Sequence, residues 1–244
     1  EAIRSISQFD GLSLANLAWA YARWLFRALP GVPQSAYSVL WGTLQRLGVL
    51  NKDVFLAISS EALRRLGSFT AQPLVNTAWA FSKLAVEDDP LFTAISAAFI
   101  ATSRQFEPPG IAGIAWSCAN RVFCDRPLLH AIASQSLPTL SEFSGLHVVN
   151  PAWSFAKLGV VHGPLLDALS AAAIPTISEL DPLALSKLAW ACAVLEVRDR
   201  PLLHAISSAA IALISEFHVQ ERLNILWAFA DLPLGPSAGP RLGP

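Results

Sequence analysis

The chain has 244 residues, of which 53% are hydrophobic and 14% are charged, and its formal net charge is −1. This apolar content excludes intrinsic disorder for most of the chain, because enough nonpolar surface is available to offset the entropy of ordering. The balance of 17 basic against 18 acidic residues excludes a strongly basic nucleic-acid binder, although it permits a weakly charged binding groove.

No membrane-spanning segment is expected. The most apolar stretches, residues 164–177 and 183–197, are interrupted by Asp167 and Lys187. Neither reaches the run of about 18 uncharged apolar residues that a transmembrane helix needs. The chain begins with Glu1 and contains no methionine, so we expect a processed or partial product in which a targeting peptide cannot be recognised.

A period of 37 residues runs through the sequence and is carried by its tryptophans. Five of them follow one another at this interval: Trp79, Trp116, Trp153, Trp190 and Trp227. Trp41 precedes the first of these by 38 residues, and Trp19 precedes Trp41 by 22. An identical octapeptide occurs at residues 125–132 and 199–206, two periods apart. This recurrence predicts a repeat architecture.

Each period is predicted to contain two helices. The first begins near a capping residue such as Asp125 and runs to about Phe143, and Pro138 and Pro175 should kink or split it in two of the repeats. The second carries the tryptophan, over about residues 146–158 in the same repeat. The predicted fold is therefore all-α: a right-handed α-solenoid of about 37-residue helix-pair repeats, each buried against its neighbours.

The solenoid is expected to cover residues 1–232, with an irregular or truncated repeat near residues 23–41. About fifteen residues of a repeat are missing there, through either a shortened first helix or a gap in the numbering. Residues 233–244 form a tail rich in proline and glycine. The recurring tryptophans are predicted to lie in the core, because apolar neighbours surround them at helical spacing, and base stacking on them is rejected. Trp24 lies outside the column and is the one tryptophan expected to be exposed.

The segment Leu-Ala-Asn-Leu-Ala-Trp-Ala-Tyr-Ala at residues 14–22, with related segments at 76–84 and 150–158, resembles a known second-helix signature. It is similar to the octotricopeptide and heptatricopeptide repeats of algal and alveolate organelles. The resemblance covers residues 2–232, and the period fits the heptatricopeptide type slightly better. The resemblance implies a function in organellar RNA metabolism, namely transcript stabilisation, processing, translation or ribosome assembly. As the organelle, the plastid is slightly preferred over the mitochondrion.

A polar stripe follows the second helices. An asparagine often stands three residues before the tryptophan and a basic residue four after it, so the two face the same way two turns apart. A small residue directly after the tryptophan would leave a gap between them. We interpret the stripe as a ladder for single-stranded RNA, in which amides meet base edges and cations meet phosphates. The alternative is a buried hydrogen-bonded ladder of asparagines between repeats, with solvated lysines. The candidate RNA-binding residues are Asn16, Arg23, Asn76, Lys83, Asn120, Asn150, Lys157, Lys187 and Asn224.

No catalytic motif and no nucleophile–base pair is recognisable, so we expect a non-enzyme with no cofactor, metal or small-molecule substrate. His130 and His204 suit surface or capping roles, and the acidic run at 87–89 suits helix capping. Cys118, Cys124 and Cys192 form no CxxC pair, and the first and last occupy a core column that is aromatic in other repeats.

The alternative function is a structural subunit docked by protein contacts on an organellar ribosome or on a photosynthetic or respiratory membrane complex. A charged fraction of 14% is low for a protein that binds RNA on its own, and it is typical of a chain that has protein partners. In this case the first-helix residues Phe99, Ile100, Leu137 and Ile211 would form the interface.

Overall fold

The computed structural model describes residues 6–28 and 52–232, which contain eleven α-helices and no strand. The chain divides after Gln135 into two compact units, which are described separately. Among the described helices, none combines the length and the hydrophobicity that a transmembrane span requires. The tail at residues 233–244 lies outside the described residues.

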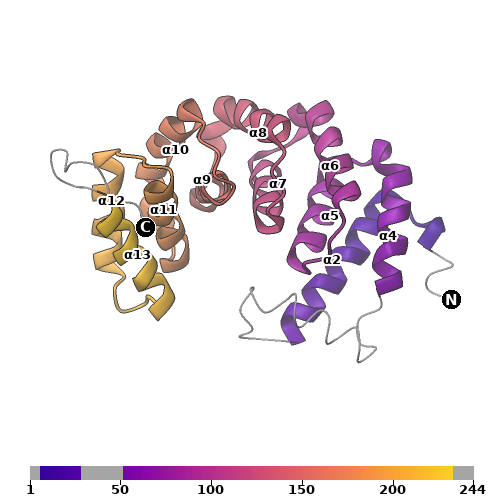
Figure 1. The fold of residues 1–244 in the computed structure, drawn as a ribbon, viewed down its shortest axis with the longest axis horizontal. Coiled ribbons are helices and arrows are strands. Elements are labelled where there is room, and N and C mark those ends of the chain that lie inside the picture. The colour runs from indigo at the N-terminus through magenta and orange to yellow at the C-terminus, as the bar shows by residue number, and fades with distance from the viewer. Residues whose placement is uncertain (1–5, 29–51, 233–244) are drawn as a thin grey trace. The chain divides into compact units, whose positions relative to one another are not determined.

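In the first unit the tryptophan-bearing helices α2, α5 and α7 lie side by side, and α4 and α6 form a second layer against them (Figure 1). Short 3-10 helices join several of these elements. The bounds are η1 Ile6–Gln8, α2 Gly11–Ala28, α4 Lys52–Arg65, η3 Leu66–Ser68, α5 Ala71–Lys83, α6 Asp89–Thr102, η4 Ser103–Gln105 and α7 Pro108–Arg121. Helix α8, Arg126–Thr139, begins in this unit and ends in the next.

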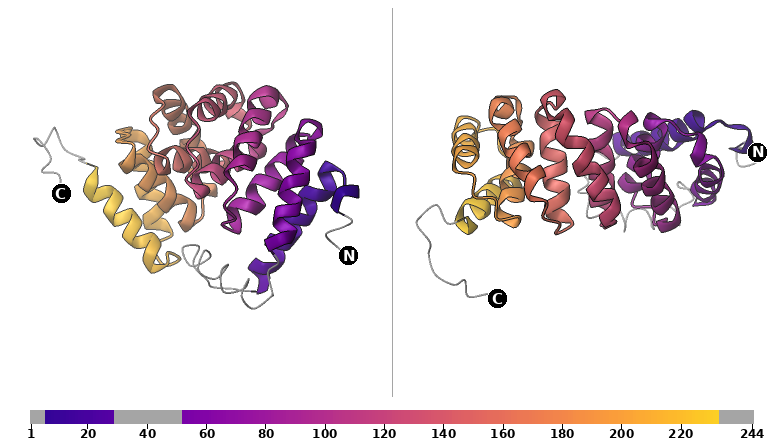
Figure 2. Two further views of the ribbon diagram at one scale, coloured as in Figure 1. Left: turned by 45° about the vertical axis from the view of Figure 1, so that its right-hand side comes forward. Right: turned by 90° about the horizontal axis from the view of Figure 1, so that it is seen from above.

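The second unit repeats this arrangement. Helices α9, α11 and α13 carry the tryptophans and lie side by side, while α10 and α12 cover them (Figure 2). Their bounds are η5 Leu140–Glu142, α9 Gly145–Lys157, α10 Gly163–Thr176, η6 Ile177–Glu179, α11 Pro182–Val194, α12 Arg200–Ala212 and α13 Val219–Asp231. The predicted all-α architecture of stacked helix pairs is therefore confirmed.

The first helix of each pair begins at a capping side chain, as predicted. The caps are Asp88, Asp125, His162 and Asp199, and each accepts a hydrogen bond from the backbone N–H three residues later, at 3.0 to 3.2 Å. A proline stands within the next two residues, where its missing N–H is not needed. The acidic run at 87–89 thus supplies a cap, through Asp88.

These first helices end earlier than predicted. Helix α8 stops at Thr139, one residue after Pro138, and continues as a 3-10 turn, and α10 does the same after Pro175. However, α4 and α6 pass into 3-10 turns at the same place without a proline. The break is a property of the repeat, because the chain must leave the helix so that the extended residue after the turn, such as Phe143, can be buried.

The position of the recurring tryptophans corrects the sequence analysis. The residues two places after them form the core, and Phe81, Cys118, Phe155 and Cys192 are all at most 4% exposed. Burial raises the pKa of the Cys118 and Cys192 thiols to about 12. By contrast, Trp79, Trp116, Trp153 and Trp190 are only half-buried. Trp227 is 46% exposed, so that Trp24, at 54%, is not the only exposed tryptophan.

Helix α2 lies directly against α5, and the Nδ2 atom of Asn76 donates to Oδ1 of Asn16 across 60 residues of sequence. This separation exceeds the 37-residue period by 23 residues, and the segment 29–51 between α2 and α4 lies outside the described residues. The irregular repeat expected near residues 23–41 falls largely on that segment, as does Trp41.

Candidate functional site

The tryptophan shares a helix face with the two polar positions that flank it. At about 100° per residue, the positions three before, at, and four after the tryptophan fall within an arc of about 60°. We call the side chains at these three positions on α2, α5, α7, α9, α11 and α13 the polar stripe. The stripe is therefore aromatic as well as polar, which the sequence analysis did not recognise.

The small residue directly after the tryptophan forms no gap in the polar stripe on α5, α7, α9, α11 and α13, although Ala20 on α2 is exposed. Ala80, Ser117, Ser154, Ala191 and Ala228 are at most 1% exposed. Small side chains at such sites allow neighbouring second helices to approach closely. The approach of α5 and α7 is so close that a Cβ atom on Gly113 would lie 2.8 Å from Cγ1 of Val75. The expected gap for a ligand is thus occupied by the packing between repeats.

In the first unit, the cations of the polar stripe lie over indole rings. The guanidinium carbon of Arg23 is 4.9 Å from the ring centroid of Trp19 on the same helix. The Lys83 ammonium is 5.4 Å from the ring centroid of Trp116, which belongs to the next repeat. These are cation–π distances, so each half-buried indole ring stabilises a positive charge beside it on the polar stripe.

The asparagines of this unit are engaged in hydrogen bonds. Asn76 accepts from Nε2 of Gln72 at 2.7 Å and donates to Asn16 at 3.4 Å. Nδ2 of Asn120 donates to both the carbonyl oxygen and the hydroxyl oxygen of Ser82. The bond to Gln72 lies within α5, whereas the bonds to Asn16 and Ser82 join neighbouring second helices, as the structural alternative expects. However, Asn16 is exposed and Asn76 is only half-buried.

In the second unit, two lysines converge on one tryptophan. The Lys157 ammonium is 4.8 Å from the ring centroid of Trp153 on the same helix, and the Lys187 ammonium, from α11, is 5.7 Å from the same centroid. Burial lowers the pKa of both lysines, and their mutual repulsion lowers that of Lys157 further. The charge of Asp181 partly opposes the shift at Lys187.

The remaining candidates lie on the same stripe without forming such a cluster. Asn150 is half-buried on α9, three residues before Trp153. Asn224 on α13 accepts a hydrogen bond from Nε2 of Gln220 at 3.0 Å and lies beside the exposed Trp227. The stripe thus brings cations onto indoles in both units, whereas its amides take part mainly in contacts within or between helices.

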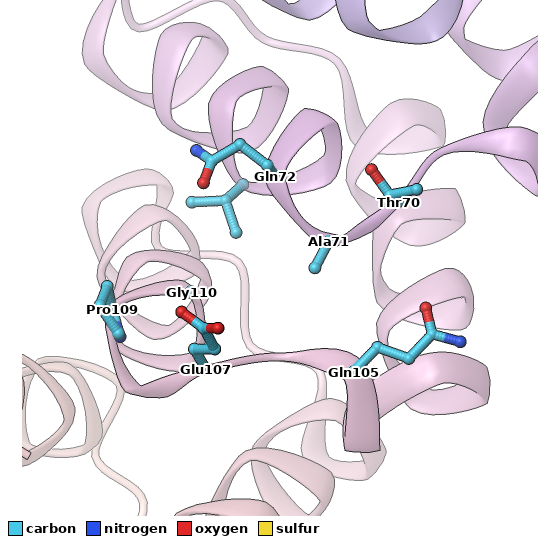
Figure 3. A pocket seen from close by; sticks show the side chains of 8 residues that line it. Thr70, Ala71, Gln72, Gln105, Glu107, Pro109 and Gly110 are labelled. Carbon is cyan, nitrogen blue, oxygen red and sulfur yellow. The ribbon is translucent and has the colours of Figure 1, made fainter. Parts of the chain in front are cut away.

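A cavity of about 400 Å³ opens between the amino-terminal ends of α5 and α7 (Figure 3). Gln72, Gln105 and Glu107 supply its polar side chains, and Thr70, Val75 and Pro109 are among its other lining residues. None of the residues that line it is cationic, and the Glu107 carboxylate disfavours a phosphate. The cavity therefore does not extend the cationic part of the stripe.

Other chemistry-bearing groups do not converge. Within residues 6–28 and 52–232, no group of three or more histidine, cysteine, aspartate or glutamate side chains could hold a metal ion. His130 and His204 are exposed on first helices, where the surface role was predicted. Cys124 is exposed, and the other two cysteines are buried in the core.

Comparison with known proteins adds a family to this geometry. The family model of the RNA-editing substrate-binding complex 6 protein matches residues 44–235, which is well over half of the chain and includes all helices from α4 to α13. A search of curated proteins found no match. The matched description names RNA editing and substrate binding, and it does not specifically support the octotricopeptide or heptatricopeptide type. The chain belongs to the RNA-editing substrate-binding complex 6 protein family.

Proposed function

We propose that this protein is a non-catalytic RNA-binding subunit of an organellar RNA-processing complex, with single-stranded RNA held along the polar stripe. The observation that carries the proposal is the placement of cations of the second helices over indole rings within each unit. These cations are Arg23 and Lys83 in the first unit, and Lys157 and Lys187 in the second. The family description, which names an RNA-editing substrate-binding complex, supports RNA as the ligand.

The chemistry of the stripe suits a single strand. Ammonium and guanidinium groups contact phosphates, while half-exposed indoles offer flat surfaces on which bases of any kind can stack. Base stacking on the tryptophans, which the sequence analysis rejected because it placed them in the core, is therefore part of this proposal. Since the net charge is −1, affinity should fall with salt less steeply than for a basic protein.

An organellar location is also part of the proposal and rests on the resemblance of the repeats. The family description does not favour a plastid over a mitochondrion, so the preference for a plastid has no support from the match.

Fluorescence anisotropy with a labelled single-stranded RNA at low salt tests this function. We expect measurable affinity for the unmodified chain and weaker binding when Asn76→Ala is combined with Lys83→Ala. The matched control combines Arg126→Ala with Ser134→Ala, two exposed positions on the first helix α8. Absence of RNA affinity at low salt would overturn the proposal, and equal affinities of the stripe variant and the control would remove these residues from the site.

A subunit docked by protein contacts is the second candidate, favoured by exposed apolar side chains on α12 and α13. Ile211 is 72% exposed, Val219 73% and Leu226 66%. Of the other predicted interface residues, Ile100 and Leu137 are 41% and 37% exposed. Phe99 is fully buried, so its assignment to an interface is wrong.

The two functions are separated by native purification from the source organelle before and after ribonuclease treatment. A stoichiometric complex that survives the nuclease supports protein docking, whereas its loss supports RNA as the component that holds the complex together.

A further inference from the structure

The cluster formed by Trp153, Lys157 and Lys187 differs from the rest of the polar stripe. Its two ammonium groups come from successive helices, α9 and α11, and lie 4.8 and 5.7 Å from the centroid of one indole ring. No other described tryptophan has two lysines over its ring. At Trp116 the position three residues before the ring is Gly113, and at Trp190 the position four after it is Val194.

The two charges of the cluster lack an anionic partner. Neither lysine forms an ion pair with a residue in the described part of the chain. The nearest acidic influence is Asp181, whose Oδ1 atom already accepts the backbone N–H of Ala184 as the cap of α11. Two half-buried like charges are unfavourable together, and an anion between them would relieve that repulsion.

The chemistry around the cluster favours a nucleotide as the source of that anion. Lysine binds phosphate as a flexible point charge, so two lysines from different helices can approach one phosphate from two sides. The half-buried indole adds apolar surface beside the two charges. Asn150 lies one turn before Trp153 on the same face, and its side chain forms no hydrogen bond with a described residue, so its amide is available to a base edge.

We propose that Trp153, Lys157 and Lys187 form a binding site for one nucleotide of single-stranded RNA, in which both ammonium groups contact the same phosphodiester. This site deepens the proposed function and rests on it. The cation–π contacts hold the two ammonium groups near the ring before the RNA arrives, so that less side-chain freedom is lost on binding.

The test measures the affinity for a labelled single-stranded RNA as a function of salt, with Lys157→Gln, Lys187→Gln and the double variant. The matched control is the double variant Arg198→Gln with Arg200→Gln, two exposed cations of the same unit at the start of α12. Each lysine variant should weaken binding about tenfold, as expected for a charge-assisted contact. Because the lysines share one phosphate, the double variant should lose much less than the product of the two losses.

The salt dependence gives an independent readout. The slope of log affinity against log salt should become shallower by about 0.7 in the double variant, which corresponds to one phosphate contact on a single strand. If the slope changes by about 1.4 and the affinity losses of the two single variants multiply in the double variant, the lysines contact two separate phosphates, and the shared contact is wrong.

The remaining outcomes separate this site from the proposed function. If the lysine double variant binds as the arginine control does, while the unmodified chain binds RNA, the site is wrong and the proposed function stands. If the unmodified chain binds no RNA, both are wrong.

A second arm follows the indole N–H resonance of Trp153, assigned with Trp153→Phe, during addition of a nucleoside 5′-monophosphate or of RNA. A shift with RNA alone supports a site for the polymer backbone, and a shift with both supports a site for any nucleotide phosphate. No shift with either overturns the site.

Discussion

The side-chain amide of Asn120 in α7 donates to both the backbone carbonyl oxygen and the hydroxyl oxygen of Ser82 in α5, each at 3.0 Å. These residues are 38 positions apart, so the bonds join the tryptophan-bearing helices of successive repeats. A ligand that took hydrogen bonds from this amide nitrogen would have to break them. Asn120 therefore fits the structural alternative better than the other candidates of the polar stripe.

Asn120→Ala should lower the stability of the first unit while leaving RNA affinity within about twofold. The loss of both hydrogen bonds to the buried Ser82 is expected to cost about 1–3 kcal/mol in the free energy of unfolding. Urea unfolding measures that cost, and anisotropy with single-stranded RNA measures the affinity. A drop in affinity as large as that of Lys83→Ala, without a loss of stability, would contradict the structural role.

The sequence predicted the repeat and its helix pairs because both depend on local, recurring signals. The 37-residue period, the capping residue Asp125 and the proline after it place the start of α8 within one residue. The apolar column two residues after each tryptophan is the core. Hydrophobicity alone predicts the tryptophans there too, whereas their angle on the helix, which the spacing contains, puts them on the face of the polar stripe.

Other features depend on which segments become neighbours in space, and a single sequence does not show this. The direct contact of α2 with α5 joins residues 60 positions apart, so the irregular amino-terminal repeat could not be resolved from spacing alone. The convergence of Lys157 and Lys187 on Trp153 likewise requires α9 and α11 to lie side by side. Each lysine was a candidate separately, but their pairing was not predicted.

The opposite roles of Trp153 and Phe155 can be compared directly. Phe155 is fully buried, so Phe155→Ala should cost about 3–5 kcal/mol in stability through cavity formation. Trp153 is half-buried, so Trp153→Ala should cost less, about 1–2 kcal/mol for the smaller apolar area that it removes from water. Urea unfolding of both variants checks the order. A larger cost for Trp153→Ala would mean that the tryptophan belongs to the core after all.

The Asp125 carboxylate both caps α8 and accepts a hydrogen bond from α6, so its substitution tests how much these contacts between neighbouring repeats stabilise the fold. Its Oδ1 atom caps α8 at 3.1 Å from the Leu128 nitrogen, and its Oδ2 atom accepts from the Ser96 hydroxyl of α6 at 2.7 Å. Asp125→Ala should therefore destabilise the chain by about 1–2 kcal/mol. Asp125→Asn keeps an acceptor for the cap and should cost less. Equal costs of the two substitutions, measured by thermal unfolding, would show that the cap contributes little.

Stability at acid pH should depend on Glu61, which is 7% exposed on α4. Its carboxylate accepts from Nε and Nη2 of Arg64 at 3.0 Å and from Nε of Arg65. These hydrogen bonds, from Arg64 first and then Arg65, lower the pKa of Glu61 from 4.5 to about 2. A carboxyl whose pKa is depressed by folding stabilises the native state above the unfolded value, and this stabilisation is lost as the pH falls from about 4.5 towards 2.

Thermal unfolding at pH 7, 4 and 2.5 measures this dependence. Glu61→Gln should lower the unfolding temperature at pH 7 and make the decline between pH 4 and 2.5 shallower than in the unmodified chain, because the group that takes up a proton on unfolding is gone. Glu179→Gln is the control, since Glu179 is exposed and forms no ion pair with a described residue. An acid transition of unchanged steepness in Glu61→Gln would show that other carboxylates control it, and that the contacts with Arg64 and Arg65 do not stabilise the fold.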